Sequence, residues 1–468
     1  MFDRRQIASP FRAPASHGSA AKYREGRLLA ILNLVLVAAV VVSPLWVSAL
    51  FFAGAGMGGA SDFILVPLIF LVNMAAIIAV SGHDGFQRQL MLMGLLLKFA
   101  AVGAYMTVAF EYYGGAADVS RYHTGAYLLA LQFAQGNLQL PAPITGSNFV
   151  IVLGSVFYSA FGTSFPSLSV AFASGAFWGV YLLYRSFRIS FPQSDHRLAG
   201  LLLFATPSLV FWNAALGKDA LAALFVSMIV YGFALTGDRT SFRAYALMFG
   251  GAAGMLMIRP HIAAMLAMAA LVPFAFGRVR GGFSGMALKM AMIPVLIAGG
   301  MYVYNGAKDF VELKDMSEVT TVMQRVARGN VAANQGSTFA ANQSVARRAL
   351  YAPFLPFRPF PWEAHSLLSF LAATEAVVLL GFTVRHLRQL LSLLRHWRHE
   401  PFVGFLAGYC AIFMVVFAGA MTNFGLLVRE RVMMLPMFLL LLIADPRALR
   451  QAGTVGRTRA AARVTAAS

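Results

Sequence analysis

The feature that most restricts what this chain can fold into is a series of long apolar runs, beginning with residues 28–50 and 63–80. A helix needs about 20 apolar residues to cross the hydrocarbon layer of a bilayer, and these runs reach that length. Because the layer holds no water, the backbone groups of each run must pair within the run, as they do in a helix. Charged residues make up only 12% of the chain, which is about half the share in soluble proteins. The sequence therefore predicts an all-α, polytopic membrane protein.

We predict twelve membrane crossings from these runs. They cover residues 28–50, 62–81, 89–110, 166–184, 198–213, 220–236, 243–258, 262–276, 286–303, 366–384, 403–421 and 431–444. This arrangement places most of the 37 Lys and Arg residues on one side, which the positive-inside rule identifies as cytoplasmic. A further apolar stretch, residues 149–162, would move every later basic connection to the other side if it crossed. We therefore predict that it forms a short helix on, or dipping into, the external leaflet.

Charge and composition also indicate where the ends of the chain lie. We expect a basic cytoplasmic segment at 1–27, a transmembrane domain at 28–445 and a basic, disordered cytoplasmic tail at 446–468. A net charge of +19 would suggest a nucleic-acid partner for a soluble protein, but here the basic residues lie in short connections beside anionic lipid. We expect membrane lipids and no nucleic acid as partners, and location in a bacterial inner membrane. Cys410 is the single cysteine, so an intramolecular disulfide is excluded.

Two long external segments follow from this topology, residues 111–165 and 304–365, and the first contains a polar cluster. Its members are Asp118, Arg121, Tyr122 and His123. On an external loop, Asp118 could act as general base for an acceptor hydroxyl, or it could bind a divalent cation such as Mg²⁺ or Mn²⁺. His123 could orient a substrate or move a proton. The alternative is a solvated loop in which Asp118 only caps a helix over residues 125–133.

Short external corners between crossings supply further candidate binding residues. Lys218 and Asp219 meet at one corner, and Arg259 and His261 at another. Lysine and arginine both bind phosphate, arginine through a bidentate fork. The alternatives are a self-neutralised surface ion pair for Lys218 and Asp219, and an arginine that extends to the lipid headgroups.

The C-terminal third adds a second group of candidates. An aromatic, proline-rich strip carries Arg358, Trp362 and Glu363, and it could be a stacking surface for a sugar or isoprenoid, or an interfacial aromatic belt. Glu375 lies within a predicted crossing, where an ionisable residue is a functional candidate unless it pairs with a buried arginine. Arg429 and Arg431 flank an acid at the external end of the last crossing, which an anionic ligand would explain.

The order of these features resembles a known family over about residues 100–280. An external acidic loop is followed by a short apolar helix ending in Phe161-Gly162, a span ending in Tyr184-Arg185, and a Pro207-Ser208 span with a polar external corner. This order is similar to that of the polytopic GT-C glycosyltransferases, in particular glycosyltransferase family 39 and its lipopolysaccharide-modifying relatives. In this chain the acidic loop follows the third predicted crossing, where the family usually has it after the first.

The resemblance implies a GT-C-like bundle whose external loops carry the site. Such an enzyme moves a sugar from a polyprenyl-phosphate donor to a lipid-linked glycan or another cell-envelope acceptor outside the membrane. The catalytic acid of the first large external loop would be Asp118, with Glu111 as the available second acid.

Two other functions remain open from the sequence. Exopolysaccharide and O-antigen polymerases of the Wzy type share the many-helix architecture and rely on external arginines, which Arg259, Arg429 and Arg431 could supply. A transporter or flippase for anionic lipid-linked glycans would need charged residues along a path through the membrane, yet only Lys98 and Glu375 lie deep within predicted crossings.

Overall fold

The computed structural model describes residues 61–115, 117–237, 242–276, 350–395, 397–398, 400–421 and 423–445. The predicted crossings 28–50 and 286–303, both terminal segments and residues 304–349 lie outside the described residues. The regular elements of the described part are all helical. They are α2 (Asp62–Ser81), α3 (Gly85–Thr107), η1 (Val108–Tyr112), α4 (Asp118–Ala134), α5 (Ser147–Phe161), α6 (Phe165–Ser190), α7 (His196–Ala205), α8 (Pro207–Phe211), α9 (Lys218–Leu235), α10 (Phe242–Ile258), α11 (Pro260–Phe276), η3 (Ala352–Phe357), η4 (Pro361–Glu363), α15 (Leu367–Arg395), α16 (Pro401–Ala420), α17 (Phe424–Arg431) and α18 (Leu435–Ile443).

Six segments of the described chain are long and apolar enough to cross a membrane. They are α2, α3 with its π-helical extension η1, α6, α9, α15 and α16. Each coincides with one of the predicted crossings, so the prediction of a multi-pass helical membrane protein is confirmed. The helix α15 continues to Arg395, well past the predicted end at residue 384.

Two predicted crossings are not the continuous helices that hydropathy indicated. The stretch 198–213 is broken at Thr206, whose extended backbone separates α7 from α8. The break follows from Pro207, because proline lacks an amide hydrogen and disfavours a helical residue before it. The stretch 431–444 contains only the nine-residue α18, and Arg431 belongs to the separate helix α17.

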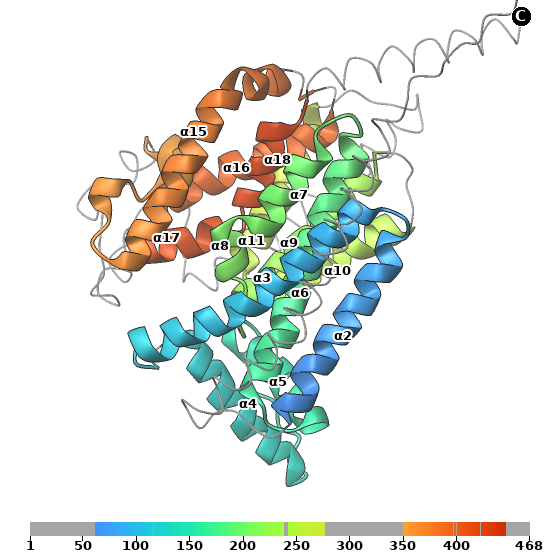
Figure 1. Ribbon diagram of the computed structural model, residues 1–468, viewed down its shortest axis with the longest axis vertical. Coiled ribbons are helices and arrows are strands. Elements are labelled where there is room, and N and C mark those ends of the chain that lie inside the picture. The colour runs from blue at the N-terminus through green and yellow to red at the C-terminus, as the bar shows by residue number, and fades with distance from the viewer. Residues whose placement is uncertain are drawn as a thin grey trace, which may run out of the picture.

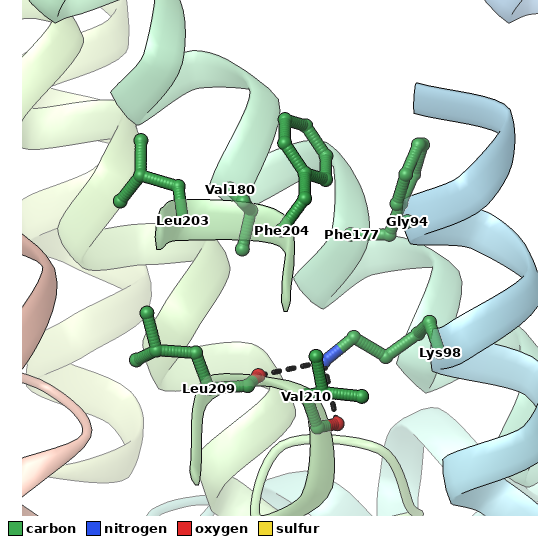
Figure 2. Close-up of a pocket in the computed structure, with 8 residues that line it drawn as sticks. All are labelled: Gly94, Lys98, Phe177, Val180, Leu203, Phe204, Leu209 and Val210. Atoms are coloured by element: carbon green, nitrogen blue, oxygen red, sulfur yellow. Dashed lines mark hydrogen bonds between the residues drawn. The ribbon is translucent and has the colours of Figure 1, made fainter. Parts of the chain in front are cut away.

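Figure 2 shows that Lys98 of α3 lies directly against α8.

The segment 111–165, which we predicted to be external, is largely helical. Its helices α4 and α5 pack closely against each other, with Gly125 against Ile151 and Gly154 against Ala126. Figure 1 shows this pair at one end of the molecule, beyond the ends of α3 and α6. The short helix predicted over 149–162 is present as α5, which has 15 residues; its predicted place at the external leaflet stays a prediction.

The position of Asp118 corrects two expectations. The polar cluster 118–123 lies on the first turns of α4 and not in a loop. Asp118 is the first residue of that helix, the N-cap position belongs to Ala117, and no side chain caps the helix. The Asp118 carboxylate contacts Arg429 of another helix instead of the amides of its own first turn.

The helix α6 forms the centre of the packed helices and is buried along most of its length. It lies between α3, α7 and α2 on one side and α9 on the other, and α9 packs in turn on α10. Small residues allow these close approaches: a Cβ at Gly179 would lie 2.8 Å from the carbonyl oxygen of Ala223 in α9. This use of glycine is typical of helix interfaces in membranes. The packing brings the start of α9, the α10–α11 corner and α17 to the same region as the start of α4.

Candidate functional site

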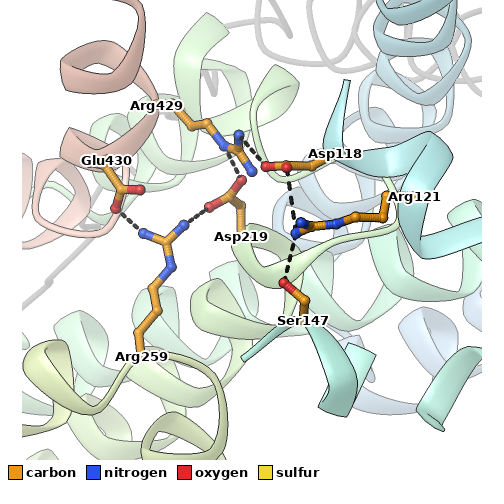
Figure 3. A network of polar contacts seen from close by, with 7 residues as sticks. All are labelled: Asp118, Arg121, Ser147, Asp219, Arg259, Arg429 and Glu430. Carbon is orange, nitrogen blue, oxygen red and sulfur yellow. Dashed lines mark hydrogen bonds and ion pairs between the residues drawn. The ribbon is translucent and has the colours of Figure 1, made fainter. Parts of the chain in front are cut away.

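A network of ion pairs joins four separate parts of the chain. Its carboxylates are Asp118 of α4, Asp219 of α9 and Glu430 of α17, and they are linked by two arginines, Arg259 at the α10–α11 corner and Arg429 of α17 (Figure 3). Four of these residues lie at predicted site positions that were expected at separate external corners. The structure therefore brings four of the predicted places into one site.

Arg259 is the buried centre of the inner half of the network. One terminal nitrogen lies 2.5 Å from Oδ1 of Asp219, and the other donates to the carboxylate of Glu430. Only 7% of Arg259 is exposed. Pro260 begins α11 directly after it, so the chain turns at this point and the Arg259 side chain is directed between α9 and α17. Two carboxylates offset the cost of burying this guanidinium.

Arg429 connects the buried half of the network to its open half. Its Nε lies 2.5 Å from Oδ2 of Asp219, and its Nη1 lies 3.2 Å from Oδ2 of Asp118. The Asp219 carboxylate raises the pKa of Arg429, which favours the charged form of this guanidinium. Asn423 fixes the start of α17 by accepting hydrogen bonds from the amides of Gly425 and Leu426.

Asp118 is the carboxylate of the network that reaches solvent. Its side chain is 43% exposed, whereas those of Asp219 and Glu430 are 11% and 12% exposed. Arg121, one turn further along α4, lies 3.8 Å from Asp118 and donates a hydrogen bond of 2.8 Å to Ser147 of α5. An exposed carboxylate beside two arginines can accept a proton while the cations stabilise negative charge nearby.

Lys218 lies next to Asp219 in sequence at the start of α9. Among the described residues its ammonium group has neither a hydrogen bond nor an ion pair. The three carboxylates of the network therefore face four cations, Arg121, Lys218, Arg259 and Arg429. The site carries one excess positive charge, which an anionic ligand would neutralise.

Glu375 and Arg431 form a second, buried cluster. Arg431 is completely buried, and its Nη2 lies 3.0 Å from Oε1 of Glu375. Its Nη1 donates to the carbonyl oxygens of Pro356 and Arg358, both at 2.9 Å. Glu375 was predicted as a binding residue, and the structure shows the alternative named for it, a pair with a buried arginine. Arg431 and Arg429, two predicted binding residues, therefore belong to different ion-pair clusters.

The hydrogen bond from Arg431 to the carbonyl oxygen of Arg358 also joins the aromatic strip to α17. Arg358 and Glu363 form an ion pair, and Glu363 also accepts the amide hydrogen of Phe360 at 2.8 Å. Trp362 is 75% exposed and stacks on Phe360 at 4.9 Å. The ring of Trp362 thus presents a free face held on a rigid backbone.

The remaining predicted residues lie outside the ion-pair network. His123 Nδ1 is 2.7 Å from the hydroxyl of Tyr158 in α5, and burial lowers the pKa of His123 below its ordinary value of 6.5. Tyr122 is buried beneath Gly217, 3.6 Å from the point where a Cβ would lie. Glu111 is exposed at the end of η1, and His261 packs near Phe417.

Glu430, Ser147 and Ser208 belong to these clusters but were not predicted as site residues. The sequence did carry a signal for Glu430, since an acid that lies between two arginines is a candidate for an ion pair. Ser147 and Ser208 are single serines with no charged neighbour in sequence, and they carry no comparable signal.

No group of three or more His, Cys, Asp or Glu side chains in the described part of the chain could hold a metal ion. Asp118, the predicted possible metal ligand, contacts arginines instead. Comparisons with protein-family models, curated proteins and solved structures find no match to this chain.

Proposed function

We propose that this protein is an integral membrane glycosyltransferase of the GT-C type. It would transfer a sugar from a polyprenyl-phosphate donor to a lipid-linked glycan or another cell-envelope acceptor on the external face. One observation supports this function above the others: a half-exposed carboxylate, Asp118, lies beside a group of cations that exceeds its carboxylates by one charge.

Transfer with inversion at the sugar needs a base and a stabilised leaving group. Asp118 would accept the proton of the acceptor hydroxyl, whose oxygen attacks the anomeric carbon. The bond from that carbon to the phosphate oxygen breaks, and polyprenyl phosphate leaves with additional negative charge. Cations already in place at the leaving group lower the barrier without reorganisation.

The geometry divides the cations into two roles. Both terminal nitrogens of Arg259 are occupied by Asp219 and Glu430, so Arg259 would support Arg429 and not touch the donor. Lys218, Arg121 and the outer face of Arg429 would contact the phosphate. This assignment replaces the expectation from sequence that Arg259 itself binds the phosphate.

The same geometry gives less support to a polymerase that depends on three external arginines. Arg259 and Arg431 are buried and bound to carboxylates. Of the three arginines, Arg429 is the one that contacts the exposed carboxylate of Asp118. The aromatic strip would lie along the path of the sugar or the isoprenoid, with the free face of Trp362 as a stacking surface.

The test is transfer of labelled sugar from polyprenyl-phosphate donors by the purified protein in liposomes. Asp118→Asn should lower transfer by at least about 100-fold, the contribution of a general base. Asp84→Asn is the matched control, because Asp84 has a similar exposed fraction of 37% and an arginine at 3.0 Å, but it belongs to the Arg188 pair at the start of α3.

Loss of transfer in Asp118→Asn with retention in Asp84→Asn would support the proposal. Full transfer by Asp118→Asn would remove Asp118 from the chemistry. If no monosaccharide donor is used but lipid-diphosphate oligosaccharides are lengthened, the protein is a polymerase.

A further inference from the structure

The short helix α8 lies inside the membrane-spanning part of the protein and leads directly to the candidate site. It comprises Pro207–Phe211, and a connection of six residues, 212–217, joins it to Lys218 and Asp219 at the start of α9. The connection is buried at Asn213, Ala214 and Leu216. Any displacement of α8 must therefore displace the start of α9.

Glu375 of α15 holds the beginning of α8. Its Oε2 accepts the backbone amide of Ser208 at 2.7 Å, and its Oε1 accepts the Ser208 hydroxyl. The amides of the first helical turn have no partner within the helix, so a carboxylate here satisfies a donor that would otherwise be unpaired. Glu375 also pairs with Arg431, which lies two residues from Arg429.

Lys98 of α3 holds the end of α8. Its ammonium group donates to the carbonyl oxygens of Leu209 and Val210, both at 2.9 Å (Figure 2). It also donates to Oδ1 of Asn213 in the connection. The neighbouring carbonyl of Ser208 is bonded by Trp212. All three protons of Lys98 are used, and its acceptors are carbonyls that α8 cannot satisfy itself.

Water is a poor substitute for Lys98 at this position. The cavity beside it has a volume of only about 10 Å³ and is lined by apolar residues including Phe177 and Phe204. A cavity needs about 10–15 Å³ and several polar partners to hold one water molecule. The ammonium group is therefore the donor on which the carbonyls of Leu209 and Val210 depend.

We propose that Lys98 and Glu375, the two deep ionisable residues of the predicted crossings, are positioning residues for the external site. Between them they fix both ends of α8 and so set the place of Lys218 and Asp219. Through Arg431, Glu375 also ties α8 to the helix that carries Arg429. The inference rests on the proposed function only in that Lys218 is taken to contact the donor phosphate.

This assignment also explains why charged groups lie so deep without forming a path. A transport route needs charges that can exchange partners with a passing ligand. Lys98 has no free proton to offer, and Glu375 is bound to Ser208 and Arg431. Their positions serve the fold around α8.

The test measures the position of residue 218 directly and needs no sugar substrate. Lys218→Cys introduces a thiol at a side chain with no described bond, and the native Cys410 is buried. The rate of labelling by a membrane-impermeant maleimide is measured in full-length protein in liposomes, with Lys98→Met, with Glu375→Gln and without either. We expect both changes to raise the labelling rate by at least about fivefold.

Asn73→Leu is the control for general destabilisation. Asn73 of α2 is likewise buried and polar, but its side chain bonds Ile69 of its own helix and Ser174 and Trp178 of α6 and no residue of α8. Labelling in Lys98→Met at the rate of the unaltered background, or at the rate of Asn73→Leu, would overturn the proposal. If Lys98→Met does not fold, Asn213→Ala removes one acceptor of Lys98 and is judged by the same criterion.

The labelling result and the transfer result are independent. Faster labelling with no sugar transfer would keep the positioning role and reject the proposed function. Transfer that depends on Asp118 with unchanged labelling would keep the function and reject the role of Lys98 and Glu375.

Discussion

Asp219 should be the residue of the network whose charge matters most for stability. It is shared by two arginines, with Arg259 and Arg429 each 2.5 Å from one of its oxygens, and its side chain is 11% exposed. Asp219→Asn keeps the size of the side chain and removes the charge. Taking one partner from a buried ion pair costs about 3–5 kcal/mol, because the remaining charge stays buried without compensation.

Asp118→Asn is the matched comparison within the same network. Asp118 also contacts Arg429, but its side chain is 43% exposed, and exposed pairs contribute at most about 1 kcal/mol. We therefore expect Asp219→Asn to lower the free energy of unfolding by about 3 kcal/mol or more, and Asp118→Asn by no more than about 1 kcal/mol. Unfolding is followed by circular dichroism during titration with SDS in mixed micelles.

A double-mutant cycle separates the ion pair from other effects of the change. Arg259→Met removes the guanidinium that Asp219→Asn leaves under-compensated, so the double variant should be more stable than the sum of the single losses predicts. Coupling between contacting residues is about 0.5–3 kcal/mol. The reasoning is refuted if Asp219→Asn and Asp118→Asn cost the same, or if the Asp219–Arg259 cycle shows no coupling.

Three further predictions follow from the packing and the exposed groups. Gly179→Ala should lower the free energy of unfolding by about 1–3 kcal/mol, because the added Cβ would meet the backbone of α9. Gly381→Ala is the control: a Cβ there would have nothing within 4 Å, so the change should be neutral or stabilise by up to about 1 kcal/mol. Equal effects of the two changes in SDS titration would contradict this. Burial lowers the pKa of His123 below 6.5, so as the pH falls through 6.5 the unfolded state takes up a proton that the folded state does not, and the free energy of unfolding falls. Between about pH 7.5 and 5.5, His123→Gln should therefore lose less thermal stability than the unaltered protein. Equal losses in the two proteins would assign the pH dependence to another group. Trp362→Ala should change the free energy of unfolding by less than about 0.5 kcal/mol since the ring is 75% exposed, yet it should raise the KM for the polyprenyl-phosphate donor severalfold; an unchanged KM would assign the ring to the membrane interface.

The individual helices show how far local pattern predicts this fold. Hydropathy located α2, α3, α6, α9, α15 and α16, because burying apolar side chains in lipid depends on the residues of one segment alone. It failed over 198–213, where the sum of apolar residues concealed the effect of a single proline at position 207. Within 111–165 it located α5 but placed the polar cluster 118–123 in a loop, although these residues form the first turns of the 17-residue helix α4.

The candidate site shows the limit of the same approach. Composition and charge bias marked Asp118, Lys218, Arg259 and Arg429 as groups at separate external corners, and each was identified by its own neighbours in sequence. Asp118 and Arg429 are 311 residues apart, and their contact depends on where α4 and α17 meet. Only the packed helices decide which acid pairs with which arginine.

The division between sequence and tertiary structure follows from the range of the forces involved. The cost of polar groups in lipid acts on each segment independently, so the amino-acid sequence alone determines that the chain is helical and has segments able to span a membrane. The strength of an ion pair depends on distance and burial, which arise only when helices distant in sequence come together. For that reason the tertiary structure decided that Arg259 and Arg431 are buried supports, that Asp118 remains open, and that Lys98 and Glu375 hold the two ends of one short helix.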